Sequence, residues 1–308
     1  MSFSADVKNE TAGIEVTGND ARAQLSALIQ MSSSLSLSNR GMGISVTLEN
    51  AAVSRTVYRL LKERYNLEIA LSVKRKMNLH KNLIYGLKIY TKAVDILKDL
   101  GIYSSRGLLE KPLQKIVNSD SNARAYLAGA FMASGSVNPP EKTNYHLEIT
   151  ANNPEHAQFL IDLLARFEIH AKTIERRSKS IVYIKQAEKI ADFLRIIGAN
   201  DAVMKFENIR ISRDFTNSLT RLNNCDVANE VKSQTAARKQ LADIEILEKR
   251  HIHLDTKLRD VAELRKANPE ASLMELCMLY EEQTGVTVSK SGMKHRFVRL
   301  HELAEKGA

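Results

Sequence analysis

Seven side chains that carry positive charge or donate hydrogen bonds are spaced along a helix expected to begin at about Ser289. They are Ser289, Lys290, Ser291, Lys294, His295, Arg296 and Arg299. No acidic residue follows within this helix before Glu302. The buried stripe of the same helix is predicted to be Met293, Phe297, Leu300 and Ala304, which recur at helical spacing. Lys and Arg bind phosphate, and Ser, Lys and His can reach base edges, so the chemistry open to this helix is recognition of double-stranded DNA.

A second group of basic side chains lies in the first third of the chain. Between Ala51 and Lys92, ten Lys and Arg residues face only two Glu, a net charge of +8 out of the formal +9 of the chain. The stretch contains two predicted strands, one ending near Lys74 and one from Leu83 to Tyr90, with a basic turn between them. The candidate DNA-contacting residues of this hairpin are Lys74, Arg75, Lys76, Lys81 and Lys88. The alternative is a solvent-exposed loop that does not contact DNA, because runs of charged residues usually lie on solvated faces.

Alternation in the first of these strands predicts one buried and one solvated sheet face. Ile69, Leu71 and Val73 are expected to face the core, and the residues between them are expected to face water.

Three short helices with clear boundary signals must position the C-terminal basic group. Asp255 can cap the first helix, which ends before Pro269. Ser272 and Glu275 form a capping box for the second helix, which stops near Gly285. This layout is typical of a helix-turn-helix, whose last helix lies in the major groove. A three-helix module with a solvated basic face is the alternative.

An internal repeat contains the other basic group. An offset of 102 residues places Leu25 on Leu127 and Arg64 on Arg166. Each copy begins with a helix of small and apolar residues, at 21–32 and 123–134, which runs into a short strand. A partner strand, an amphipathic helix, two more strands and a closing helix follow.

The predicted fold class is therefore α+β, a two-repeat α/β domain with antiparallel sheets linked to an all-α domain. A length of 308 residues fits two folding units. The expected boundaries are 1–198 for the repeat domain, with copies at about 21–100 and 123–198, then 199–250 for a linker and connecting helix, and 251–308 for the helix-turn-helix domain. The connecting helix is polar, and packing on the repeat domain is its alternative role.

Cysteine usage and hydropathy favour a cytoplasmic protein. Cys225 and Cys277 lie far apart, cannot form a metal cage, and are expected to be buried thiols in a reducing compartment. The first residues lack the layout of a signal peptide, and no apolar stretch approaches the roughly 20 residues of a membrane span.

The opening helix of the second copy resembles the LAGLIDADG helix of homing endonucleases, where helices from two repeats pack at a pseudo-twofold axis. The match is Leu127-Ala-Gly-Ala-Phe-Met-Ala-Ser-Gly135, and the first copy has Leu25-Ser-Ala-Leu-Ile-Gln-Met-Ser-Ser33 in register. In active nucleases an acid near the end of each motif holds divalent metal. Ser32 and Ser134 stand at these positions, and a neutral hydroxyl is a poor ligand for a hard cation. We expect no catalytic residue, no metal and no cofactor.

The whole chain resembles the WhiA family of bacterial regulators. The resemblance rests on Ser289-Lys-Ser-Gly-Met-Lys-His-Arg296, Pro269-Glu-Ala-Ser-Leu-Met-Glu-Leu276, Asn223-Asn-Cys-Asp-Val-Ala-Asn229 and the opening Met1-Ser-Phe-Ser-Ala-Asp-Val-Lys-Asn-Glu10. It implies a degenerate LAGLIDADG domain before a helix-turn-helix, and DNA-binding regulation of transcription linked to sporulation or to cell division and chromosome segregation. Lys294 departs from the asparagine that the family often has.

Two functions of different classes remain open at this point. The first is a sequence-specific transcription regulator, cytoplasmic and nucleoid-associated, expected to be a monomer bound to double-stranded DNA. The second is an architectural nucleoid protein that coats DNA through the basic first repeat. A residual nuclease is disfavoured by Ser32 and Ser134. Sequence specificity separates the first two functions.

Overall fold

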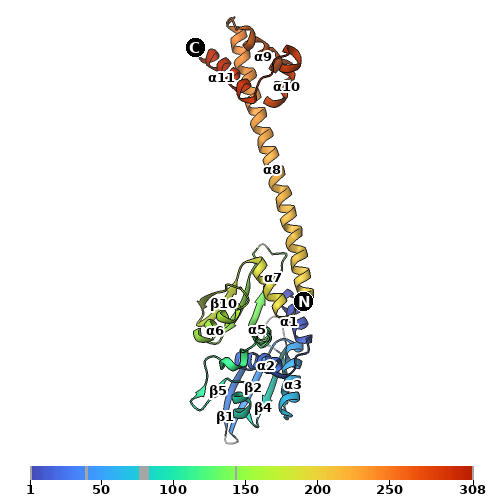
Figure 1. The fold of residues 1–308 in the computed structure, drawn as a ribbon, viewed down its shortest axis with the longest axis vertical. Helices are drawn as coiled ribbons and strands as arrows, with labels where there is room; N and C mark the ends of the chain where they lie inside the picture. The colour runs from blue at the N-terminus through green and yellow to red at the C-terminus, as the bar shows by residue number, and fades with distance from the viewer. Residues whose placement is uncertain (1, 39–40, 76–82, 143, 307–308) are drawn as a thin grey trace. The chain divides into compact units, whose positions relative to one another are not determined.

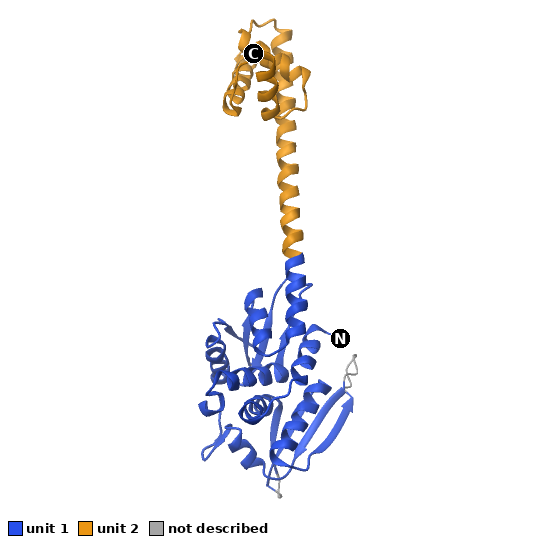
Figure 2. Ribbon diagram, turned by 45° about the vertical axis from the view of Figure 1, so that its right-hand side comes forward, with its two compact units in different colours: residues 1–212 blue, residues 213–308 orange. Residues whose placement is uncertain are grey.

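The computed structural model describes residues 2–38, 41–75, 83–142 and 144–306. The chain divides into two compact units, residues 1–212 and 213–308, coloured separately in Figure 2. The first unit holds every strand of the described chain, and the second is helical.

The first repeat is a four-stranded antiparallel sheet with helices packed on one face (Figure 1). Its elements are α1 (Phe3–Gly13), α2 (Gly18–Ser32), β1 (Ser33–Ser38), β2 (Gly41–Leu48), α3 (Ala51–Tyr65), β3 (Ala70–Arg75), β4 (Leu83–Ile89) and α4 (Ala93–Asp99). The strand order is β1-β2-β4-β3. A short hairpin of β5 (Tyr103–Ser104) and β6 (Gly107–Leu108), then the 3-10 helix η1 (Gln114–Val117), lead to the second repeat.

The second repeat has the same sheet topology and, apart from α1, which has no counterpart in it, the same element order. Its elements are α5 (Asp120–Ser134), β7 (Gly135–Val137), β8 (Leu147–Ala151), α6 (Pro154–Ala165), β9 (Lys172–Arg176), β10 (Lys179–Ile184) and α7 (Ala187–Ile196). The strand order β7-β8-β10-β9 matches that of the first repeat element for element. The predicted fold class, two α/β repeats with antiparallel sheets, is confirmed.

Helices α2 and α5 lie against each other at very close range and join the two repeats. Gly129 of α5 faces α2, where an added Cβ would overlap the backbone carbonyl of Gln24 and lie 3.0 Å from the Cβ of Ala27. Leu25 and Leu127, equivalent in the two repeats, are both fully buried. Because the backbones nearly touch, only glycine fits at position 129.

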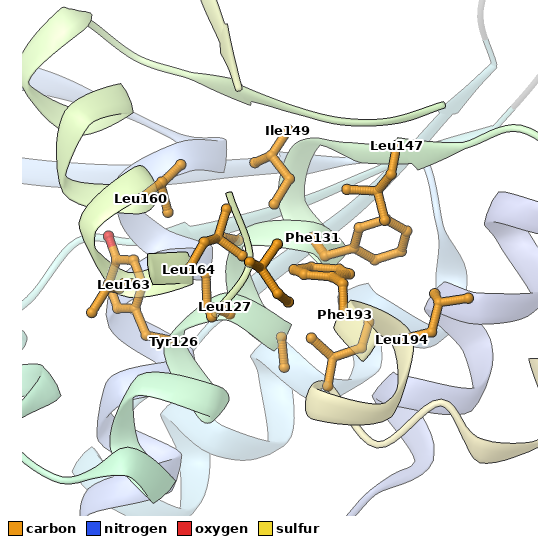
Figure 3. Close-up of a cluster of buried hydrophobic side chains, with 14 of the residues drawn as sticks. Tyr126, Leu127, Phe131, Leu147, Ile149, Leu160, Leu163, Leu164, Phe193 and Leu194 are labelled. Atoms are coloured by element: carbon orange, nitrogen blue, oxygen red, sulfur yellow. The ribbon is translucent and has the colours of Figure 1, made fainter. Parts of the chain in front are cut away.

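A continuous apolar core fills the second repeat between its helices and its sheet (Figure 3). Phe131 of α5 and Phe193 of α7 have ring centroids 5.7 Å apart. The buried Tyr126 hydroxyl lies 2.9 Å from Nε2 of His156, and burial lowers the pKa of His156 to about 4. This histidine is therefore a neutral core residue at pH 7.

One sequence-based expectation about the first sheet is wrong. Leu71 and Val73 of β3 were expected in the core, but they are 64% and 61% exposed. Strand β3 is the edge strand of its sheet, and the covering helix α3 packs on the central strands β2 and β4. Alternation assigns a residue to a face of a sheet, but it does not show whether a helix covers that part of the face.

Helix α8 (Asn200–Lys249) is continuous over 50 residues and contains the boundary between the two units. Its first turns contribute Ala202, Val203 and Phe206 to the core of the first unit. Every side chain from 214 to 232 is exposed. Cys225 lies in this exposed part, so the prediction that both thiols are buried is wrong for Cys225 and right for Cys277.

Three short helices complete the second unit, namely α9 (Thr256–Ala267), α10 (Leu273–Thr284) and α11 (Lys290–Lys306). Asp255 caps α9, and Ser272 and Glu275 form the predicted capping box of α10. Gly285 ends α10 with a φ of 71°. The three helices share one core with Ile244 and Leu247 from the end of α8.

Candidate nucleic-acid interface

Helix α11 presents its basic residues to solvent on the side opposite its buried stripe. Met293, Phe297, Leu300 and Ala304 are buried, as their spacing predicted. Six predicted contact residues are exposed, namely Ser289, Lys290, Ser291, Lys294, His295 and Arg299. The Ser289 hydroxyl accepts a hydrogen bond from the backbone N–H of Gly292 at 3.1 Å, which caps the helix. The open N-terminal turn also favours an anion, because its backbone N–H groups point outward.

Arg296 is directed into the fold instead of outward. Its guanidinium carbon lies 4.6 Å from the centre of the Tyr280 ring on α10. Its Nη1 atom is buried without a hydrogen-bond partner. The neighbouring Arg299 is exposed but pairs with Glu302 at 2.9 Å. Of the seven residues singled out on this helix, Arg296 is therefore placed to hold α11 against α10.

Replacing Arg296 with glutamine is expected to leave the salt dependence of DNA affinity unchanged. Each phosphate contact that is lost lowers the slope of log K against log salt by roughly 0.9. The matched variant Lys290→Gln removes an exposed charge at the start of the same helix and should lower the slope by about one unit. Fluorescence anisotropy at several salt concentrations measures both slopes, and an equal decrease for Arg296→Gln would contradict its inward role.

The first sheet gives a second basic surface, on the face away from its helices. Cross-strand partners share a face, and Ala70 of β3 pairs with Lys88 of β4. Lys74 lies four residues along β3 from Ala70, so Lys74 and Lys88 share this face, and both are exposed. Arg75 is exposed on the opposite side of the sheet, paired with Leu83. Lys76 and Lys81 lie outside the described residues.

Small polar residues make up much of this face, beside Ile84 opposite Lys74 and Ala70 opposite Lys88, and the sequence analysis did not single them out. They are Ser34, Ser36, Ser45, Thr47 and Ser72, placed on the same side by strand register. Together with Gly43 and Gly86 they make a face of low relief beside the lysines. Their signal in the sequence was alternation of small polar with apolar residues.

The corresponding face of the second sheet is chemically different. Glu148 lies near its middle and accepts a hydrogen bond from the Ser136 hydroxyl at 3.2 Å. His146 lies 3.1 Å from the other oxygen of Glu148 and stacks on the Tyr183 ring. Strand register puts the exposed Lys172, Arg176 and Lys179 on this face as well, so it combines one carboxylate with three basic side chains. The carboxylate near its middle, which repels phosphate, is what distinguishes it from the first sheet.

Ser32 and Ser134 end the two central helices, as the repeat predicted. Each hydroxyl donates to a backbone carbonyl, Ser32 to Leu28 and Ser134 to Thr150 at 2.7 Å. Among the described residues, no group of three or more His, Cys, Asp or Glu side chains is placed to hold a metal ion. In the same part of the chain, no helix has the length and apolar character needed to span a bilayer.

The fold and these surfaces define a class of protein, a LAGLIDADG-like repeat domain joined to a helix-turn-helix domain. Family models agree with this class over the chain. They match the WhiA N-terminal LAGLIDADG-like domain at 19–103, the WhiA LAGLIDADG-like domain at 123–216 and the WhiA C-terminal HTH domain at 219–304. The chain belongs to the WhiA family.

Relatives of similar length support the family assignment. The chain is 44% identical to the "Probable cell division protein WhiA" of Staphylococcus saprophyticus, over 99% of this chain and 97% of the relative. The same name and identity describe the relative from Staphylococcus carnosus, with the same coverage. Among solved structures, full-length DUF199/WhiA from Thermatoga maritima has a TM-score of 0.61 at 24% identity and covers 99% of both chains. That likeness supports the fold.

Proposed function

We propose that the protein is a non-enzymatic, sequence-specific DNA-binding regulator of transcription. The observation that carries the proposal is the exposed basic face of α11, with Lys290, Lys294 and His295 on the side opposite a fully packed stripe. In a helix-turn-helix the last helix enters the major groove, and its N-terminal residues read base edges. Lys294 and His295 are the proposed readers of bases.

The sheet face of the first repeat is the proposed second contact with the same DNA. Lys74 and Lys88 lie on an exposed face among small polar residues, which permits close approach of a phosphate backbone. Two tethered sites raise each other's effective concentration and so strengthen binding without a new contact. In this proposal the protein acts in the cytoplasm on the nucleoid, as a monomer, and a role in cell division is supported by the name of its relatives.

The proposal that the protein has no nuclease activity rests on Ser32 and Ser134. Both hydroxyls are engaged with backbone carbonyls at the ends of the paired helices. A hydrolytic site for phosphodiesters needs carboxylate ligands for its metal ions, and these two positions offer none.

An architectural role is the second candidate, favoured by the concentration of charge in the first repeat. The stretch from Ala51 to Lys92 carries ten of the chain's 45 Lys and Arg residues and only two Glu. Phosphate contacts of this kind bind all sequences alike. On the architectural account, α11 adds affinity but no choice of sequence.

The test of the proposed function combines binding and cleavage in one assay. Purified protein is mixed with supercoiled plasmid in the presence of Mg²⁺ or Mn²⁺ and analysed by gel mobility before and after removal of the protein. The expected result is a retarded band that returns to intact supercoiled DNA. Metal-dependent nicking that changes when Ser32 and Ser134 are replaced would contradict the proposal that the protein is not an enzyme. A plasmid whose mobility the protein does not change would contradict the proposal that it binds DNA.

A further inference from the structure

The segment that contains α10 has a charge opposite to that of the chain as a whole. From Pro269 to Val288 the sequence has four Glu and neither Lys nor Arg, although the chain carries a formal charge of +9. The four are Glu270, Glu275, Glu281 and Glu282. All four side chains are exposed in the structure. This acidic segment directly precedes the basic helix α11.

Two methionines are exposed on the same side of α10 as these acids. Met274 is 54% exposed and Met278 is 57% exposed. They lie four residues apart, so they are neighbours on one helix face, and Glu281 and Glu282 continue that face by one turn. The opposite side of α10 buries Leu276, Cys277 and Tyr280 in the core. More than half of each methionine is thus open to solvent, away from this core.

A shallow groove of about 530 Å³ runs beside this helix face. It is lined by Asn268, Glu270, Ala271, Glu275, Met278, Leu279 and Glu282. Met278 and Leu279 form its apolar part, and three carboxylates surround them. The Glu275 carboxylate accepts a hydrogen bond from the backbone of Ser272, while Glu282 makes no hydrogen bond or ion pair among the described contacts. A free carboxylate beside exposed thioethers suits an apolar ligand that carries positive charge.

We propose that the α10 face, defined by Met274, Met278 and Glu282 together with Glu270 from the turn before the helix, is a docking surface for a basic, amphipathic segment of another protein. Phosphate is repelled by this face, so DNA is not its ligand. Methionine side chains adapt their shape to a partner's apolar residues, and carboxylates around them select Lys and Arg. The charge of the surface is complementary to a basic helix and to nothing acidic. The inference concerns the second unit's own surface and holds whether or not the proposed DNA contacts are correct.

The test uses the full chain and two synthetic 14-residue peptides with equal positive charge. One alternates Leu with Lys at helical spacing, and the other has Ser in place of every Leu. Methionine methyl groups labelled with ¹³C report the site, since Met274 and Met278 are two of nine methionines. The Leu/Lys peptide is expected to shift both signals and to bind at least about tenfold more tightly than the Ser/Lys peptide.

Variants locate the effect and control for loss of charge. The change M278A/E282Q avoids the capping residue Glu275 and should weaken the Leu/Lys peptide by about tenfold or more. The control M204A/E141Q removes the same chemical groups at exposed positions in the first unit and should leave the affinity unchanged.

Three outcomes would overturn the docking surface. The two peptides could bind equally tightly, or the shifted signals could belong to methionines other than Met274 and Met278. The affinity for the Leu/Lys peptide could also be unchanged in M278A/E282Q. Sedimentation of the free protein tests a second copy of the chain as the occupant. A self-association that M278A/E282Q abolishes would assign the face to a homodimer and also overturn the proposal.

Discussion

Replacing Gly129 with leucine is expected to destabilise the first unit by more than about 3 kcal/mol, because the added side chain has no space between α2 and α5. A Cβ at this position already overlaps the carbonyl oxygen of Gln24, which is backbone and cannot rotate away. The two helices must separate, and both repeats pack on them. For a unit of this size the loss should lower the Tm by roughly 6 to 12 °C.

Calorimetry of the full chain measures this effect, with the transition of the second unit as an internal reference. Gly13→Leu is the matched control, since an added Cβ there meets nothing within 4 Å and Gly13 is exposed at the end of α1. The control should stay within about 0.5 kcal/mol of the original protein. Similar losses for both variants would show that the close approach of α2 and α5 is not what limits position 129.

Replacing Arg265 with methionine is expected to cost the second unit about 3 kcal/mol or more. Arg265 is only 2% exposed, and its guanidinium donates to the carbonyl of Ala271 at 2.6 Å and to Oε1 of Gln240 at 3.0 Å. The same group lies 5.4 Å from the centre of the Phe297 ring on α11. Methionine keeps most of the apolar stem but leaves these part-buried acceptors without a donor. Arg265 therefore ties α8, the turn before α10, and α11 together.

Arg259→Met is the control for this change, because Arg259 is exposed on the same helix α9. In thermal unfolding followed by circular dichroism, the transition of the second unit should move for Arg265→Met and stay in place for Arg259→Met. If the second unit of Arg265→Met unfolds at the original temperature, water or other donors replace the guanidinium, and the prediction is wrong.

Local signals in the sequence predicted the local features of both units. The caps at Asp255 and Ser272 and the stripe through Met293 and Phe297 depend on neighbours within one or two turns, and the structure has them all. The internal repeat predicted the equal topology of the two sheets, because equivalent core positions recur in the same order. These features need no knowledge of distant contacts.

Features that depend on distant contacts were missed. Arg296 lies at the margin of the buried stripe on α11, and Tyr280 of another helix decides that it turns inward. The exposure of Leu71 follows from the position of β3 at the edge of its sheet. Cys225 lies in the part of α8 where every side chain from 214 to 232 is exposed, although cysteine is usually buried. None of these three features can be read from the residues next to it in the sequence.

The central claim is that α11 selects a DNA sequence while the first sheet adds general affinity. Two variants separate these roles. The triple variant S291A/K294A/H295A changes α11, and the double variant K74A/K88A changes β3 and β4. Each base-edge contact is worth about 1 to 3 kcal/mol of discrimination, whereas phosphate contacts act alike on all sequences. Circular dichroism confirms that each variant remains folded.

The most direct measurement is the ratio of affinities for a duplex selected from a random pool and for a scrambled duplex of equal length and composition. The account predicts a ratio of at least about a thousand for the original protein. It should fall by about a hundredfold or more in S291A/K294A/H295A and stay unchanged in K74A/K88A, which should weaken both duplexes equally. An equal loss on the two duplexes for the α11 variant would contradict the account, because that helix would then hold only phosphates.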